Sequence, residues 1–253
     1  MYYMRKWFIS GVVVVLLASV FGLATKTIEP GPLDDIGIMA AHRGGADVYP
    51  ENTLTAFNAI QRDMPGVVLE MDVRALKDGT LVVTHDATVD RTTNSTGRVG
   101  DMSLAQWRSL RVNGPSGTAP ASTLQEVLDV YADTDVPMFV ELKDYTVADK
   151  FIETLFPHRA QIVVAAFNKG VAERFLKSGF QTMQLSTKQP ALIDGVQYVG
   201  VSNTNITAAF ASQAHAQNTK VWAWGDDVTG DTPIGDTRGI DGYIANDPRL
   251  EVT

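Results

Sequence analysis

The chain has 253 residues, of which 45% are hydrophobic and 20% charged, the composition of one globular domain with a sizeable core. A formal net charge of −8, without any cluster of Lys and Arg beyond isolated pairs, excludes nucleic acid as a partner because a polyanion requires a basic surface. The chain contains no cysteine, which excludes a disulfide framework, a thiolate zinc site and a cysteine nucleophile.

The first 24 residues predict an export signal. Arg5 and Lys6 precede an apolar stretch, residues 7–24, which is long for a signal-peptide core and barely long enough to span a bilayer. A small-x-small pattern before Thr25 resembles a cleavage site, so a removed signal peptide and a retained transmembrane anchor both stay open. Either one places the rest of the chain outside the cytoplasm, periplasmic or secreted, because the positive flank stays inside. An anchor would also associate the protein with the membrane through residues 7–24.

Residues 25–37, with two Pro and two Gly, predict a linker into a folded domain of residues 38–253. From residue 36 onward, short β-rich runs alternate with amphipathic helical stretches. Many runs are apolar on both faces, as in a parallel sheet covered by helices. About eight such units favour a (β/α)₈ TIM-type barrel. The strand candidates are 36–43, 66–73, 80–86, 137–143, 160–167, 181–187, 198–203, 220–225 and 239–246, and the helix candidates are 52–63, 122–133, 147–156, 169–179 and 207–218.

One connection does not fit the alternation. About eight residues separate Asp72 from Leu81, too few for a parallel crossover, and the turn signal Lys-Asp-Gly lies between them. We therefore expect a hairpin at this point, with one of the nine strand candidates acting as an extension.

Polar side chains end the first four predicted strands. A TIM barrel carries its chemistry at the carboxyl ends of its strands, so we expect these side chains to share one rim. They are His42 and Arg43 after the first strand, Glu70 and Asp72 in the second, His85 after the third, and Glu141 with Lys143 in the fourth.

The acidic residues of this set predict a metal site. Glu70 and Asp72 are two residues apart on one strand and therefore project from the same face. Burying two unpaired carboxylates costs several kcal/mol each, so a positive charge must lie between them. A divalent cation held by Glu70, Asp72 and Glu141 meets that need, and oxygen-only ligands favour Ca²⁺ or Mg²⁺ over zinc.

At these residues the sequence resembles the glycerophosphodiester phosphodiesterase family, over about residues 38 to 248. The family's opening motifs, HRG and PENT, match "AHRGGADVYPENTLTAF", and its E-x-D, DG, HD and RTT-G stretch matches "LEMDVRALKDGTLVVTHDATVDRTTNSTGRV". Later motifs resemble "STLQEVL", "FVELK", "VWAWG" and "DGYIANDP". In the last two, Gly225 stands where the family usually has Asn, and Ala-Asn replaces Thr-Asp, so the far wall of the pocket is expected to differ.

The resemblance implies a (β/α)₈ barrel and metal-dependent hydrolysis of glycerophosphodiesters to glycerol 3-phosphate and an alcohol. It also implies roles for individual residues: His42 and His85 as the acid and base pair, Glu70, Asp72 and Glu141 as metal ligands, Arg43 and Lys143 as phosphate contacts, and Glu51 as a ligand or a residue just behind the metal. The chemistry agrees, because an imidazole titrates near neutral pH and can take or give a proton. Our preferred assignment is His42 as base and His85 as leaving-group acid.

Two features of the sequence each allow two interpretations. Trp222 and Trp224 share a strand face, and Trp222 either lines the substrate pocket or fills the barrel. Residues 91–117 form a long polar excursion with one helical pattern, and they are either a decorated loop or a lid.

Two other function classes stay open. One is a phosphatidylinositol-type phospholipase C or a lysophospholipase D acting on membrane lipid, which the three carboxylates disfavour. The other is a noncatalytic, membrane-tethered binding protein, which the intact His42 and His85 disfavour.

Overall fold

The computed structural model of the protein describes residues 39–131, 134–225, 228 and 237–249. The predicted export segment and linker, residues 1–37, lie outside the described residues, so their assignment stays a prediction. Within the described ranges, no helix combines the length and apolar character needed to cross a membrane.

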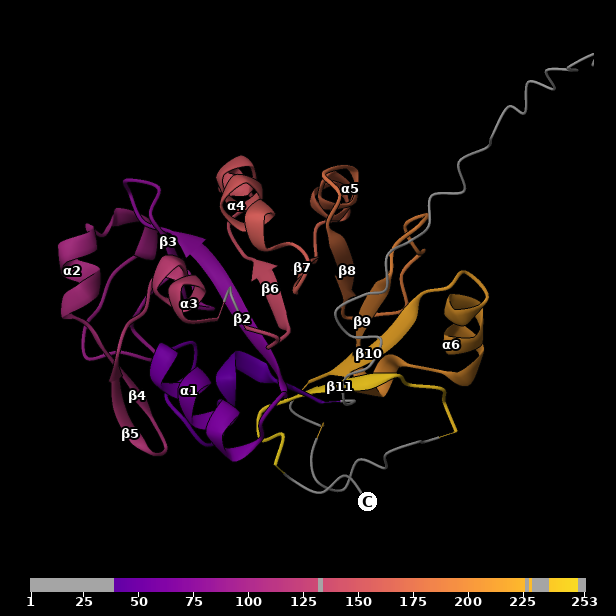
Figure 1. The fold of residues 1–253 in the computed structure, drawn as a ribbon, viewed down its shortest axis with the longest axis horizontal. Coiled ribbons are helices and arrows are strands. Elements are labelled where there is room, and N and C mark those ends of the chain that lie inside the picture. The colour runs from indigo at the N-terminus through magenta and orange to yellow at the C-terminus, as the bar shows by residue number, and fades with distance from the viewer. Residues whose placement is uncertain (1–38, 132–133, 226–227, 229–236, 250–253) are drawn as a thin grey trace, which may run out of the picture.

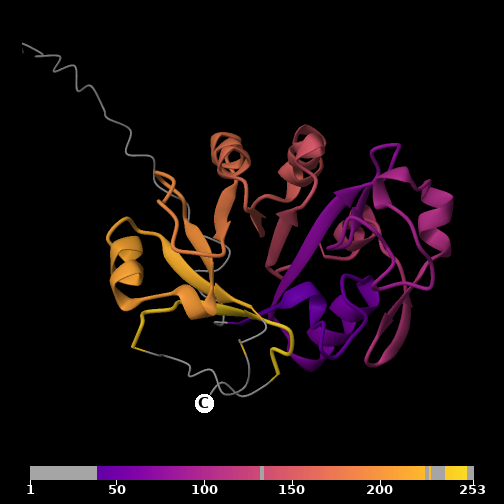
Figure 2. The ribbon, with the colours of Figure 1, turned by 180° about the vertical axis from the view of Figure 1, so that it is seen from behind.

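Eight parallel strands form a closed barrel (Figures 1 and 2). Their order around the barrel is β1-β11-β10-β9-β8-β7-β6-β2, and the pairing of β1 with β2 closes it. The predicted TIM-type barrel is therefore confirmed. The barrel strands are β1 (Met39–Ala41), β2 (Val68–Ala75), β6 (Met138–Leu142), β7 (Ile162–Ala166), β8 (Gln181–Ser186), β9 (Tyr198–Ser202), β10 (Lys220–Trp224) and β11 (Gly242–Ala245).

The predicted amphipathic stretches form helices outside the barrel. Three of them begin at side chains that cap the first turn, Thr53, Asn168 and Thr207, each of which accepts a hydrogen bond from a backbone N–H. The loop between β8 and β9 contains no helix. The α-helices are α1 (Leu54–Asp63), α2 (Leu104–Ser109), α3 (Leu124–Tyr131), α4 (Ala148–Leu155), α5 (Lys169–Lys177) and α6 (Ala208–His215). The 3₁₀ helices are η1 (His42–Gly44), η2 (Val99–Asp101), η3 (Tyr145–Val147), η4 (Phe156–His158) and η5 (Asn203–Asn205).

The predicted hairpin is present. Strand β3 (Leu81–Val83) pairs antiparallel with the end of β2, with Val73 opposite Val83, and lies outside the barrel. This corrects one expectation, because His85 follows an antiparallel extension and not a barrel strand. The connection from β2 is too short for a parallel crossover, so the chain turns back along the same strand.

The polar excursion is a small folded unit of its own. It contains η2, α2 and a hairpin of β4 (Arg111–Gly114) and β5 (Gly117–Pro120). The hairpin lies beside α1 in both views. Trp107 of α2 is 1% exposed and belongs to a separate apolar cluster with β3. The hairpin approaches the loop after β1 closely, because a Cβ at Gly114 would lie 2.5 Å from the Pro50 backbone.

Strand alternation divides the core into two layers. In β2, Leu69, Met71 and Val73 face the helices, whereas Val68 faces the barrel interior. Glu70 and Asp72 therefore share the inward face with Val68. The same alternation in β6 places Glu141 on the inward face, so all three acidic residues point into the barrel.

Candidate active site

Three carboxylates from two neighbouring strands converge at one end of the barrel. Asp72 lies beside Glu141 in the parallel register of β2 and β6, and Glu70 precedes Asp72 on the same face. One oxygen of each carboxylate lies within 4.8 Å of the others, and the three residues are only 5%, 1% and 6% exposed in sequence order. The structure thus brings together the residues that the sequence predicts as metal ligands.

The carboxylates carry more negative charge than their surroundings neutralise. Burial, together with the charge of Asp72, raises the pKa of Glu70 well above its ordinary value. The same two causes raise the pKa of Glu141 from 4.5 to about 7. Burial also acts to raise the pKa of Asp72, but the charges of Lys143 and Arg43 outweigh it and hold that pKa below the ordinary value. Asp72 is therefore the ionised centre of the cluster at neutral pH.

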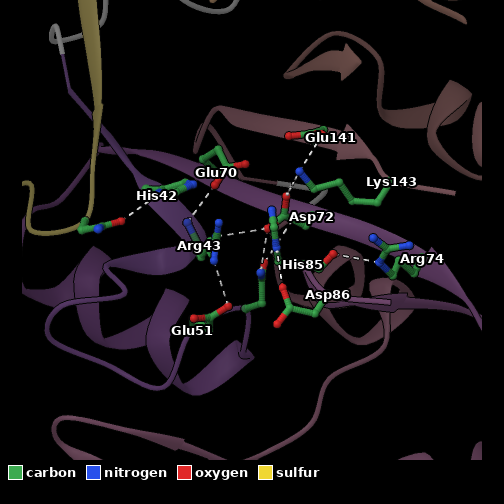
Figure 3. A network of polar contacts seen from close by, with 12 residues as sticks. His42, Arg43, Glu51, Glu70, Asp72, Arg74, His85, Asp86, Glu141 and Lys143 are labelled. Atoms are coloured by element: carbon green, nitrogen blue, oxygen red, sulfur yellow. Dashed lines mark hydrogen bonds and ion pairs between the residues drawn. The ribbon is translucent and has the colours of Figure 1, made fainter. Parts of the chain in front are cut away.

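Arg43 lies at the centre of the polar network (Figure 3). Its backbone N–H donates to Glu70 Oε2 at 2.7 Å, its Nε lies 3.5 Å from Asp72 Oδ2, and its Nη1 donates to Glu51 Oε1 at 3.2 Å. The residue has a left-handed φ of 53°, which is rare for a side chain other than glycine, and its carbonyl accepts a hydrogen bond from Asn52 N at 2.8 Å. The strained backbone aims both the N–H and the guanidinium at the acidic cluster.

Lys143 pairs with two of the three carboxylates. Its Nζ lies 2.7 Å from Glu141 Oε1 and 3.3 Å from Asp72 Oδ1, and 5.6 Å from the centre of the Phe167 ring. Lys143 is not among the residues that line the cavity of the site. Its predicted contact with phosphate therefore stays a prediction, and its observed partners are the carboxylates.

His42 is held by an amide. Its Nδ1 lies 2.6 Å from Asn246 Oδ1, which follows β11. Burial, and then the charge of Arg43, lower the pKa of His42 from 6.5 to about 4. Its Nδ1–H donates to the amide oxygen, so the neutral ring has its free electron pair on Nε2.

His85 is held by a carboxylate. Its Nδ1 lies 2.7 Å from Asp86 Oδ1, and its carbonyl accepts a hydrogen bond from Arg74 Nε at 2.8 Å. Burial lowers the pKa of His85, while the charge of Asp72 and the hydrogen bond to Asp86 oppose that change. A neighbouring carboxylate stabilises the imidazolium form more strongly than the neutral amide beside His42 does.

Glu51 lies outside the cluster of three carboxylates. Its carboxylate binds Arg43 and accepts two hydrogen bonds from Arg91, at 2.7 and 2.8 Å. Burial acts to raise the pKa of Glu51, but these arginines outweigh it and lower the pKa below the ordinary value. Of the two predicted positions for Glu51, the structure places it behind the cluster.

A cavity of about 230 Å³ opens beside these residues. Its lining combines a polar set with a larger set of apolar residues and one glycine. The polar residues are His42, Arg43, Glu70 and His85, and the others are Phe139, Ala165, Phe167, Met183, Leu185, Trp224, Gly225 and Ile244.

The two tryptophans of β10 differ in depth. Trp222 is 3% exposed and packs edge-on against Phe139 at a centroid distance of 4.8 Å, and it is not among the cavity-lining residues. Trp224 lines the cavity and packs edge-on against Phe167 at 5.5 Å. The structure therefore favours the barrel-filling interpretation for Trp222, and it assigns the position at the pocket wall to Trp224.

The polar excursion contributes no residue to the cavity lining. Its contact with the site is through Arg91, which binds Glu51 and Asp86. The excursion therefore supports the site from outside, and the lid interpretation gains no support.

Four polar residues of the site were not predicted individually. Asn52 donates from Nδ2 to Asp72 Oδ2 at 2.9 Å and accepts from Asp72 N at 3.1 Å, and the others are Asp86, Arg91 and Asn246. The first three stand inside motifs that carry the family resemblance, namely PENT, HD and RTT. Asn246 belongs to the Ala-Asn pair that replaces the family's Thr-Asp. Each of the four residues therefore lies in a segment that carries the family resemblance.

The acidic cluster fits a hard divalent cation. Its donors are oxygens, and two of them, Asp72 Oδ1 and Glu141 Oε1, are buried and accept no hydrogen bond from the described residues, although the Lys143 ammonium lies near both. A cation at this position would relieve the repulsion that raises the pKa of Glu70 and Glu141.

Fold and site define the class of protein. A parallel (β/α)₈ barrel with polar residues gathered at the carboxyl ends of its strands is the arrangement of a TIM-barrel enzyme.

Comparison with known proteins identifies the family. Residues 42–190 match the model of the glycerophosphoryl diester phosphodiesterase family. A glycerophosphodiester phosphodiesterase from Caldanaerobacter subterraneus is 30% identical over 232 residues, covering 83% of this chain and 94% of that protein. The chain therefore belongs to the glycerophosphoryl diester phosphodiesterase family and is an enzyme.

Solved structures share the fold. A glycerophosphodiester phosphodiesterase from Agrobacterium tumefaciens superposes with a TM-score of 0.72 at 20% identity, covering 86% of this chain and 100% of that chain. A phosphodiesterase from Oleispira antarctica, solved with its product sn-glycerol 3-phosphate, gives a TM-score of 0.73 at 20% identity, covering 88% and 98%.

Proposed function

We propose that the protein hydrolyses glycerophosphodiesters, such as glycerophosphocholine or glycerophosphoethanolamine, to glycerol 3-phosphate and an alcohol, with Ca²⁺ or Mg²⁺ as cofactor. The observation that carries this proposal is the arrangement at the carboxyl end of the barrel. There, the carboxylates of Glu70, Asp72 and Glu141 meet within 4.8 Å, and His42 and His85 line the adjoining cavity. Family membership and the product named for the Oleispira relative support the substrate class.

Charge neutralisation is the first requirement of the reaction. Phosphodiester cleavage places negative charge on the phosphoryl oxygens, and preorganised positive groups lower the barrier. Arg43 lines the cavity and is held in place by Glu51 and Asp72, so its guanidinium is oriented before substrate binds. A cation bound by the three carboxylates would add Lewis-acid stabilisation of the same oxygens.

The two histidines divide the proton transfers. His42 stays neutral, because burial and the charge of Arg43 disfavour its imidazolium, and it therefore acts as the base that takes a proton from the attacking oxygen. The Asp86 carboxylate partly offsets the burial that lowers the pKa of His85, so His85 is the histidine that gives a proton to the departing alkoxide. The bond between phosphorus and the alcohol oxygen breaks, and water supplies the new oxygen overall.

Metal removal tests the proposal. Purified protein is treated with chelator, then Ca²⁺ or Mg²⁺ is restored, and release of glycerol 3-phosphate is followed with a coupled enzyme across a panel of diesters. We expect turnover to disappear with chelator and to return with the cation. Turnover that chelator does not change would favour the metal-independent phospholipase C type. Hydrolysis restricted to lysophospholipids would favour a lysophospholipase D, and no hydrolysis in any state would favour a binding protein.

We also propose that the barrel works outside the cytoplasm. Support comes from the sequence of residues 1–24, in which two basic residues precede an apolar stretch. Mass spectrometry of the protein from membrane and soluble extracytoplasmic fractions separates a cleaved signal from a retained anchor. Recovery of the full-length chain from the cytoplasm would contradict export.

A further inference from the structure

A chain of charge-assisted contacts links His85 to Glu51 through Arg91. Arg91 Nε donates to Asp86 Oδ2 at 2.6 Å, while its two terminal nitrogens donate to the Glu51 carboxylate at 2.7 and 2.8 Å. Asp86 binds His85 Nδ1 through its other oxygen, at 2.7 Å. One planar guanidinium therefore holds two carboxylates of the site in a fixed relative orientation.

These contacts fix geometry more than they stabilise the fold. The Arg91 side chain is 50% exposed, and ion pairs at such a position add little to the free energy of unfolding. Glu51 and Asp86 are less exposed, at 13% and 28%, and each binds a residue that lines the cavity. The consequence of losing Arg91 should therefore appear in the orientation of those residues.

The polar excursion supports Arg91 from behind. Asn113 N in β4 donates to the carbonyl of Thr92 at 2.7 Å, which fixes the backbone next to Arg91. At the end of the same strand, Gly114 lies against the backbone of Pro50, where a Cβ would come within 2.5 Å. The residue after Pro50 carries the carboxylate that Arg91 binds, so one hairpin positions both partners of the contact.

We propose that Arg91 is a positioning residue, which fixes Asp86, and through it the ring of His85, relative to the Glu51 carboxylate that also binds Arg43. The inference rests on the proposed function, in which His85 protonates the leaving group and Arg43 binds phosphate. Arg91 is not among the cavity-lining residues, so its effect passes through these partners.

The first test compares Arg91→Met with a matched control, Arg108→Met. Arg108 belongs to α2 of the same excursion, is 61% exposed and lies 3.7 Å from Glu126. With glycerophosphocholine as substrate, we expect Arg91→Met to lower kcat about tenfold to a hundredfold, as for one charge-assisted hydrogen bond, with a smaller change in KM. Arg91→Lys keeps the charge without the planar donor array and should recover part of the loss. The control should stay within about twofold of wild type.

A double-mutant cycle with Asp86→Asn separates positioning from a general structural effect. If Arg91 acts through Asp86, the double variant should lose little more kcat than Asp86→Asn alone. Fully additive losses, or an Arg91→Met kcat equal to that of the control, would overturn the inference. Should Arg91→Met fail to fold, as judged by circular dichroism, the same cycle is run with Arg91→Lys.

The activities of wild type and of Arg91→Met also show which proposal has failed, the positioning role of Arg91 or the proposed function. A wild-type enzyme that hydrolyses no glycerophosphodiester would refute the proposed function, and the inference with it. A wild-type enzyme that is active, together with an unaffected Arg91→Met variant, would refute the inference alone.

Discussion

Replacing Glu141 with Gln is expected to stabilise the metal-free protein and to remove most of the stabilisation that a divalent cation gives to wild type. Without the cation, the folded protein holds a proton on Glu141 up to a pKa of about 7, whereas the unfolded chain releases it at 4.5. The folded state therefore loses stability as pH rises from 4.5 to 7, and the loss is complete above pH 7. The difference in pKa corresponds to about 3 kcal/mol. Gln has no charge to bury, so metal-free Glu141→Gln should exceed wild type by up to that amount at pH 8.

Urea denaturation followed by circular dichroism measures this difference. In chelator, the advantage of the variant should be largest at pH 8 and should shrink toward pH 5. At a free Ca²⁺ or Mg²⁺ concentration of about a hundred times Kd, wild type should gain about 2.7 kcal/mol, and the variant much less. Glu153→Gln, an exposed position in α4, serves as the control that changes neither. Equal gains for Glu141→Gln and wild type, or a pH-independent difference in chelator, would refute the reasoning.

Three further predictions concern the imidazoles and the tryptophans. Asn246→Asp places a carboxylate beside His42 Nδ1 and should raise the pKa of His42 from about 4 by roughly one to three pH units. In the pH profile of kcat/KM, the acidic limb should shift to higher pH by the same amount, because a protonated His42 cannot act as base. An unchanged profile would argue against that role. His42→Ala and His85→Ala should each lower kcat at least about a hundredfold with the fold retained, and near-normal rates in both would contradict their assignment. Trp224→Ala should raise KM, whereas Trp222→Ala should mainly lower the free energy of unfolding, by about 3–5 kcal/mol; the opposite pattern in kinetics and urea denaturation would show that their depths in the barrel are misassigned.

The barrel was predictable because its signals are local. Short apolar runs separated by amphipathic stretches predicted its strands and helices, and the Lys-Asp-Gly turn predicted the antiparallel extension. The convergence of Glu70, Asp72 and Glu141 followed from the two-residue period of a strand and from the common rim of a parallel barrel. Each inference needed only the type of the local structure, not its exact packing.

Other parts of the site depended on contacts between distant segments. The hairpin of β4 and β5 has few apolar residues, so its sequence does not alternate as a buried strand would. The pairing of Arg91 with Glu51 joins residues 40 positions apart, which no local pattern indicates. Trp222 and Trp224 share a face, but only the folded structure shows that Trp222 packs against Phe139 whereas Trp224 lines the cavity.

Crystallography with Mn²⁺ tests the central claim most directly. Crystals of the enzyme soaked in Mn²⁺, and measured for anomalous scattering at the manganese edge, should show a peak within ligand distance of Glu70, Asp72 and Glu141, with His42 and His85 facing the same cavity. A peak at another position, or carboxylates that point away from one another in an enzyme that needs the cation for turnover, would contradict the account.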